Sequence, residues 1–80
     1  MEWKEINGHL TKEFEFNNFA EAIDFVNKIA PLAERKNHHP DIFIHSYKKV
    51  RIMLFTHSEN KISEKDYSMS REIDRLQKQK

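Results

Sequence analysis

Apolar residues in this sequence follow a period of two in some stretches and a period near 3.6 in others, and this limits the folds open to the chain. Residues 1–16 are predicted to form a β-hairpin around Asn7-Gly8, because this dipeptide tolerates positive φ at both turn positions. Lys12 breaks the alternation of the second strand once. A second hairpin is expected over residues 41–57, with its turn at residues 46–49 and His57 at the end of the longest strand.

One helix is predicted after each hairpin. Asn18 can cap the first helix while Glu21 reaches back, and that helix is expected to end around Lys36 with a kink or a tightened last turn near Pro31. Ser63 followed by Asp66 gives a second capping pattern at the start of the last helix. The apolar stripe of the first helix is expected to contain Phe19, Ala22, Ile23, Val26, Ile29, Ala30 and Ala33.

The resulting order, ββαββα, predicts an α+β fold. We expect a four-stranded antiparallel sheet with two helices packed on one face. At 80 residues the chain is long enough for one small domain and too short for two, so residues 1–80 are predicted to form a single domain with a thin core.

Composition excludes several function classes. A formal net charge of +1 argues against direct nucleic-acid binding and against a membrane-surface role. With no Cys there is no disulfide framework and no thiol nucleophile, and the single Gly excludes glycine-rich nucleotide loops. The chain has no apolar run of membrane-spanning length and no signal-peptide stretch at its start, so we expect a cytoplasmic protein.

Residues 34–40 carry the most informative pattern, because two adjacent histidines precede a proline. Pro40 disfavours helical geometry at His39, so the imidazoles of His38 and His39 should point in different directions. Tyr47, His57 and Asp66 follow, and each of them also has a purely structural interpretation. Asp66 can be a helix cap, Tyr47 can pack on the sheet, and His57 can be structural, while Glu34 alone would be a solvated charge at a helix end. His9 and His45 are interpreted as surface residues.

Together these residues resemble the signature of the pterin-4a-carbinolamine dehydratases, also described as dimerisation cofactors of a homeodomain transcription factor. The matching positions are Glu34, His38-His39-Pro40, Tyr47, His57 and Asp66. Trp3 and Asn18-Phe19 also look like family positions, and the resemblance spans about Trp3 to Ile73. Two departures are visible: many relatives carry a helix before the Trp3 region, and the usual Gly-Leu-Thr before the last helix reads Lys61-Ile62-Ser63 here.

The resemblance implies an enzyme, a hydro-lyase that dehydrates a 4a-hydroxytetrahydropterin to the quinonoid dihydropterin and so supports tetrahydrobiopterin recycling. Histidine can donate or accept the protons involved near neutral pH. We expect His38 and His57 to form the acid/base pair and His39 to support it or hold the pterin. Glu34 and Asp66 would orient imidazoles, and Pro40 and Tyr47 would complete the substrate site. Neither a metal nor an organic cofactor is required. Adjacent histidines rarely converge on one ion, which argues against a zinc site.

A binding module is the competing interpretation. Some members of this family act as coactivators by docking on the dimerisation helices of a homeodomain factor, and the stripe from Phe19 to Ala33 would supply that surface here. The resemblance also implies dimers that join their sheets, commonly assembled into tetramers through helices. A thin core and a free sheet edge favour a homodimer or homotetramer on physical grounds as well.

Overall fold

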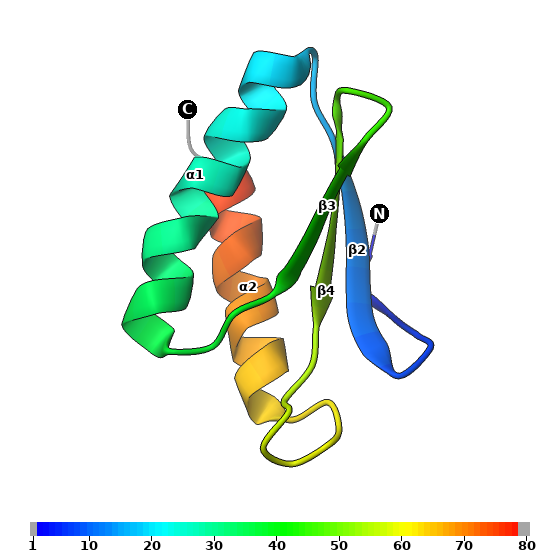
Figure 1. Ribbon diagram of the computed structural model, residues 1–80, viewed down its shortest axis with the longest axis vertical. Helices are drawn as coiled ribbons and strands as arrows, with labels where there is room; N and C mark the ends of the chain where they lie inside the picture. Colours follow the sequence, from blue (N-terminus) through cyan, green and yellow to red (C-terminus); the bar gives the residue numbers. More distant parts are fainter. Residues whose placement is uncertain (1, 79–80) are drawn as a thin grey trace.

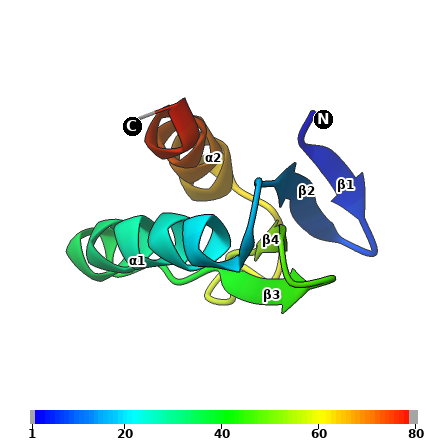
Figure 2. The same cartoon turned by 90° about the horizontal axis from the view of Figure 1, so that it is seen from above.

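The computed structural model describes residues 2–78 and confirms the α+β fold (Figure 1). Its strands form one antiparallel sheet in the order β1-β2-β4-β3. Figure 2 shows both helices on the same face of that sheet, as predicted. The elements are β1 (Lys4–Ile6), β2 (His9–Glu15), α1 (Phe19–Lys36), β3 (Asp41–His45), β4 (Lys49–Leu54) and α2 (Glu64–Lys78).

Both hairpins form where the sequence predicts them. Asn7 and Gly8 have φ values of 52° and 79°, the positive values that a two-residue hairpin turn requires. The second turn also uses left-handed backbone, with φ values of 51° at Ser46 and 52° at Tyr47. β4 is shorter than expected, however, because it ends at Leu54 and not at His57, and the longest strand is β2.

The chain leaves β4 through a small closed loop. The backbone N–H of Thr56 donates to the Lys61 carbonyl (3.0 Å), and the N–H of Lys61 donates back to Thr56 (3.3 Å). These two bonds pair residues 56 and 61 with each other within the loop. The pairing of β4 with β2 has already ended, at Leu10 opposite Leu54. His57 therefore lies in a turn and not in a strand.

Local hydrogen bonds define both ends of α1. The Asn18 side chain accepts from the Glu21 N–H (2.8 Å), and the Glu21 carboxylate accepts from the backbone N–H of Asn17 (3.0 Å), so Glu21 reaches back as predicted. The helix continues through Pro31 and ends at Lys36. Asn37 then adopts left-handed geometry (φ 50°), which is a common way for a helix to stop.

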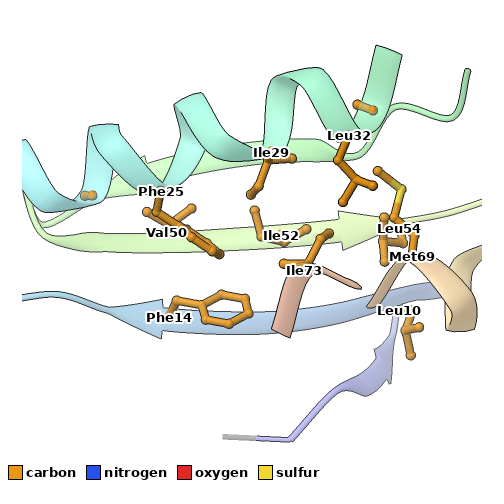
Figure 3. Packing of buried hydrophobic residues seen from close by; sticks show 12 residues of the cluster. Leu10, Phe14, Phe25, Ile29, Leu32, Val50, Ile52, Leu54, Met69 and Ile73 are labelled. Atoms are coloured by element: carbon orange, nitrogen blue, oxygen red, sulfur yellow. The ribbon is translucent and has the colours of Figure 1, made fainter. Parts of the chain in front are cut away.

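The core lies between the helices and the sheet (Figure 3), and the face of α1 that fills it differs from the predicted stripe. Phe25 and Leu32 are buried, although they were not expected in the stripe, whereas Phe19 is 53% exposed and Ala30 is also exposed. Phe25 packs against the ring of Phe14 at a centroid distance of 4.8 Å. α1 has apolar residues on two adjoining faces, and packing against the sheet selects only one of them.

Lys12, which breaks the alternation of β2, lies on the face of the sheet that the helices cover. Its ammonium pairs with the Asp74 carboxylate on α2 at 2.9 Å. The same carboxylate oxygen accepts from the indole N–H of Trp3 at 3.0 Å. The irregularity in the pattern is therefore an ion pair that ties β2 to α2. Within residues 2–78, no helix is both long enough and apolar enough to cross a bilayer.

Candidate functional site

The centre of the candidate site is a hydrogen-bonded pair formed by His38 and Asp66. The Nε2 atom of His38 lies 2.6 Å from Oδ1 of Asp66, although the two residues are 28 positions apart. Asp66 is fully buried, and the His38 side chain is 14% exposed. A charged carboxylate can only accept, so the ring nitrogen that faces it carries the proton. Asp66, one of the two residues expected to orient an imidazole, thus contacts His38 directly.

Asp66 is held by the start of α2. Its second oxygen, Oδ2, accepts from the Thr56 hydroxyl at 2.7 Å and from the Ser63 backbone N–H at 2.9 Å. The Ser63 hydroxyl in turn lies 2.7 Å from the Thr56 hydroxyl and accepts from the Lys65 N–H at 3.3 Å. The capping interpretation of Asp66 is thus confirmed, and the same carboxylate also binds His38. One oxygen caps the helix while the other holds the imidazole.

The end of α1 positions His38. Its backbone N–H donates to the Ala33 carbonyl at 3.1 Å, while the N–H of Asn37 donates to the Glu34 carbonyl at 3.2 Å. These are the two bonds of a Schellman motif, which fixes the direction of the chain beyond the helix. Because Pro40 favours extended geometry immediately afterwards, the backbone of the two histidines is constrained from both sides.

His39 forms a separate pair. Its Nε2 atom lies 2.6 Å from Oε2 of Glu34 on the last turn of α1. Both side chains face solvent, at 56% exposure for His39 and 77% for Glu34. The expectation that neighbouring imidazoles point in different directions agrees with the two partners, since His38 binds α2 and His39 binds α1. An exposed pair of this kind contributes little to stability.

His57 and Tyr47 are not hydrogen-bonded to this pair. His57 is exposed in the turn after β4, where its ring packs edge-on against Phe55 at 5.1 Å. The loop that carries His57 connects the end of β4 to the start of α2, and both lie at the same end of the sheet (Figure 1). Tyr47 is 62% exposed in the β3–β4 turn at the opposite end. Within residues 2–78, no hydrogen bond joins the rings of His38, His39 and His57 to one another.

A cleft of about 340 Å³ opens beside His38, between the end of α1 and the start of α2. Its volume falls in the range of small-molecule sites. His39 and His57 do not line it. The lining residues are Lys36, His38, Glu64, Lys65, Ser68 and Met69.

Lys36 is held at this cleft by an ion pair with Glu72 at 2.6 Å. The hydrogen bond from Lys36 lowers the pKa of the Glu72 carboxyl below its usual range. Both residues were missed in the sequence, as were Thr56 and the other lining residues. Two features of the sequence could have indicated these residues. Thr56 adjoins His57, and the lining residues of α2 follow Ser63 at helical spacing.

His45 was interpreted as a surface residue, but its side chain is only 22% exposed and is paired. Its Nε2 atom lies 2.5 Å from Glu13, which Arg51 also approaches at 3.3 Å on the uncovered face of the sheet. The hydrogen bond from His45 lowers the pKa of Glu13 most strongly, and burial opposes this shift. Among residues 2–78, no three His, Asp or Glu side chains are grouped as metal ligands.

Comparisons with known proteins match almost the whole chain. The family model described as pterin 4 alpha carbinolamine dehydratase matches residues 1–76. A protein of Alkaliphilus metalliredigens, provisionally named pterin-4-alpha-carbinolamine dehydratase, is 47% identical over 95% of this chain and 68% of its own length. One of Sulfolobus acidocaldarius with the same provisional name is 41% identical over 94% of this chain and 81% of its own.

Two solved structures share the fold. A protein of Brucella melitensis, described as a transcriptional coactivator/pterin dehydratase, superimposes with a TM-score of 0.86 at 34% identity, covering 92% of this chain and 80% of its own. A pterin dehydratase-like protein, described as a RuBisCO assembly factor of the alpha-carboxysome, has a TM-score of 0.82 at 24% identity, covering 100% and 94%. The second likeness is one of fold alone.

Proposed function

The chain belongs to the pterin 4 alpha carbinolamine dehydratase family, and on this basis we propose that it catalyses the dehydration of a 4a-hydroxytetrahydropterin. The observation that carries the proposal is the hydrogen bond between His38 and the buried Asp66 at the edge of a cleft of small-molecule size. The product is the quinonoid dihydropterin, so the reaction would return an oxidised pterin to the recycling route.

The chemistry needs one proton delivered and one removed. The C4a–oxygen bond breaks as the hydroxyl takes a proton and leaves as water, and a ring N–H gives up its proton as the new double bond forms. His38 can exchange a proton with the substrate through Nδ1, because Asp66 occupies Nε2. The buried carboxylate stabilises the imidazolium that forms when Nδ1 accepts a proton. No step consumes an oxidant or a reductant.

The remaining signature residues take the roles that the family resemblance implies. His57, which is exposed in the turn after β4, is the proposed second member of the acid/base pair. His39 and Glu34 would support the pair from the outer side, where they are already hydrogen-bonded. Pro40 holds the chain that carries the two histidines. A homo-oligomer is proposed as the active form.

The direct test is a stopped-flow assay on freshly generated 4a-hydroxypterin. His38→Ala and His57→Ala should each lower kcat by roughly 10²-fold or more, the usual scale of an acid/base contribution. His9→Ala is the control, because the His9 ring contacts the Asn7 carbonyl and the ring of Phe55 and does not line the cleft. The pH–rate profile of the wild type should be bell-shaped. Wild-type rates in both the His38 and the His57 variants would contradict the assignment.

A second candidate function, a protein-binding module, is favoured by one observation on α1. Phe19 is 53% exposed, and the partly exposed Ile23 and the exposed Ala30 continue from it along α1, while Val26 packs against the edge of the core. Such a face suits docking of a partner's amphipathic helix. A pull-down with candidate partner helices separates the two functions. Phe19→Asp should abolish binding and leave dehydration intact, whereas His38→Ala should do the reverse.

A further inference from the structure

The cleft beside His38 has one charged group without a partner of opposite charge. The lining side chains that are charged at neutral pH are Lys36, Glu64 and Lys65. Among residues 2–78, the ammonium of Lys65 has no hydrogen-bond or ion-pair partner, and only its backbone N–H is bonded, to the Ser63 hydroxyl. An ammonium that has no carboxylate beside it keeps its full attraction for an anion. The Lys65 side of the cleft can therefore hold a negatively charged part of a ligand.

The other two charges are already paired within the chain. The Lys36 ammonium lies 2.6 Å from Oε2 of Glu72. The hydrogen bond from Lys36 lowers the pKa of the Glu72 carboxyl, which therefore stays ionised near neutral pH. The Glu64 carboxylate lies 3.4 Å from Arg71, about two turns further along α2. Each pair has no net charge, so the unpaired charge of the lining side chains is that of Lys65.

α2 places Lys65 on the same wall as the apolar floor of the cleft. Ser68 and Met69 follow Lys65 at the spacing that puts side chains on one face of a helix, and their Cα atoms lie about 5 Å further along its axis. Met69 is buried and belongs to the core, so it offers an apolar surface on which a planar ring can lie. A ring on Met69 with one edge at His38 has its substituents within reach of the flexible stem of Lys65.

The opposite end of the cleft suits the neutral part of a pterin. Glu72 follows Ser68 by about one turn of α2 and holds Lys36 there, so this end has a hydrogen-bond donor beside an acceptor. The pyrimidine ring of a pterin has N–H donors beside a carbonyl acceptor and carries no net charge. The two ends of the cleft therefore differ: charge is paired at Lys36 and unpaired at Lys65. This difference gives a bound pterin a preferred direction.

We propose that the site takes a pterin whose side chain at C6 carries an anionic group, and that Lys65 binds this group. A phosphate and a carboxylate share the required chemistry, because either accepts charge-assisted hydrogen bonds from an ammonium. The C4a–oxygen bond then lies beside Nδ1 of His38, and the side chain of the pterin runs along α2 to Lys65. Lys65 takes no part in the proton transfers and determines which pterin is bound. This inference rests on the proposed function for its reaction, but the preference for an anionic side chain can be measured without turnover.

Binding is tested by calorimetric titration with stable dihydropterins that differ in their C6 side chain. One ligand has a neutral polyhydroxy side chain, the second has the phosphate monoester of that side chain, and the third has a side chain that ends in a carboxylate. At least one anionic ligand should bind about tenfold more tightly than the neutral one, and the two anionic ligands distinguish phosphate from carboxylate. The preference should decrease as the salt concentration rises. A neutral ligand that binds as tightly as both anionic ones would overturn the proposal.

Variants of Lys65 test whether this side chain is the source of the preference. Lys65 is exposed, so Lys65→Gln should fold; it should weaken the anionic ligand about tenfold and change the affinity for the neutral one by less than about twofold. Lys65→Arg keeps the charge and should keep most of the preference. Lys78→Gln is the matched control, because it makes the same change in net charge about 20 Å along α2. An equal loss in Lys78→Gln, or a preference that survives Lys65→Gln, would overturn the proposal.

Turnover separates this inference from the proposed function. With the 4a-hydroxy form of the preferred anionic pterin, Lys65→Gln should raise KM about tenfold and leave kcat nearly unchanged, because Lys65 contacts a part of the substrate that does not react. If the wild type dehydrates neutral and anionic substrates with the same KM, the inference fails and the proposed function stands. If it dehydrates neither, the proposed function fails, and the titrations still decide whether Lys65 selects an anionic pterin. If no pterin binds, both fail.

Discussion

Replacing Asp66 with Asn tests whether one buried carboxylate both caps α2 and orients His38. Asp66 is fully buried and accepts three hydrogen bonds, from Thr56 (2.7 Å), Ser63 (2.9 Å) and His38 (2.6 Å). Asn has the same shape but only one acceptor oxygen. If that oxygen keeps the bonds to Thr56 and Ser63, the amide nitrogen must face His38. The ring can then only accept at Nε2.

The expected loss of stability follows from these three bonds. Hydrogen bonds to a charged group contribute about 2 kcal/mol each and neutral ones about 1 kcal/mol. The two retained bonds and the inverted bond to His38 would each lose about 1 kcal/mol, so Asp66→Asn should destabilise the fold by about 3 kcal/mol. In the neutral ring, acceptance at Nε2 moves the proton to Nδ1, the nitrogen available to the substrate. We therefore expect kcat to fall by roughly 10²-fold as well.

Urea unfolding followed by circular dichroism measures the first effect, and the dehydration assay measures the second. Asp24→Asn, an exposed carboxylate on α1, is the control and should change the free energy of unfolding by less than about 0.5 kcal/mol. The reasoning is refuted if Asp66→Asn has the same free energy of unfolding as the wild type and retains the wild-type kcat. Loss of stability with an unchanged kcat would leave Asp66 as a helix cap only.

Three further predictions concern the scaffold. Asn37→Ala should lower the free energy of unfolding by about 1 kcal/mol because position 37 is left-handed, whereas Asn37→Gly should not; chemical denaturation compares the two. The pKa of Glu13 is lowered by its bond from His45, so Glu13 stabilises the fold above the usual glutamate range of about 4.3 and loses this effect in acid. Thermal midpoints of Glu13→Gln should accordingly fall below wild type near pH 7 and converge with it near pH 3; a constant gap contradicts this. Lys12→Met should lower the free energy of unfolding by less than about 1 kcal/mol, because its partner Asp74 is partly exposed. A larger decrease, measured by urea unfolding, would contradict this estimate of the ion pair's contribution.

The elements could be predicted because their signals are local. Asn7-Gly8 can adopt the turn geometry by itself, and Asn18 and Ser63 bind backbone groups within three residues of themselves. These interactions do not depend on the rest of the fold. The face of α1 could not be predicted in the same way, because Phe25 and Phe19 both lie on apolar stripes of the helix. Packing against the rings of Phe14 and Phe16 distinguishes Phe25 from Phe19.

The same distinction between local signals and tertiary packing applies to the candidate site. The sequence alone determined the order of strands and helices and the residue types available for proton transfer, since both depend on neighbours along the chain. Tertiary structure decided that His38 meets Asp66 and that His39 turns instead to Glu34. Residues 28 positions apart meet only when the end of α1 and the start of α2 come together at one end of the sheet, and no local spacing encodes that approach.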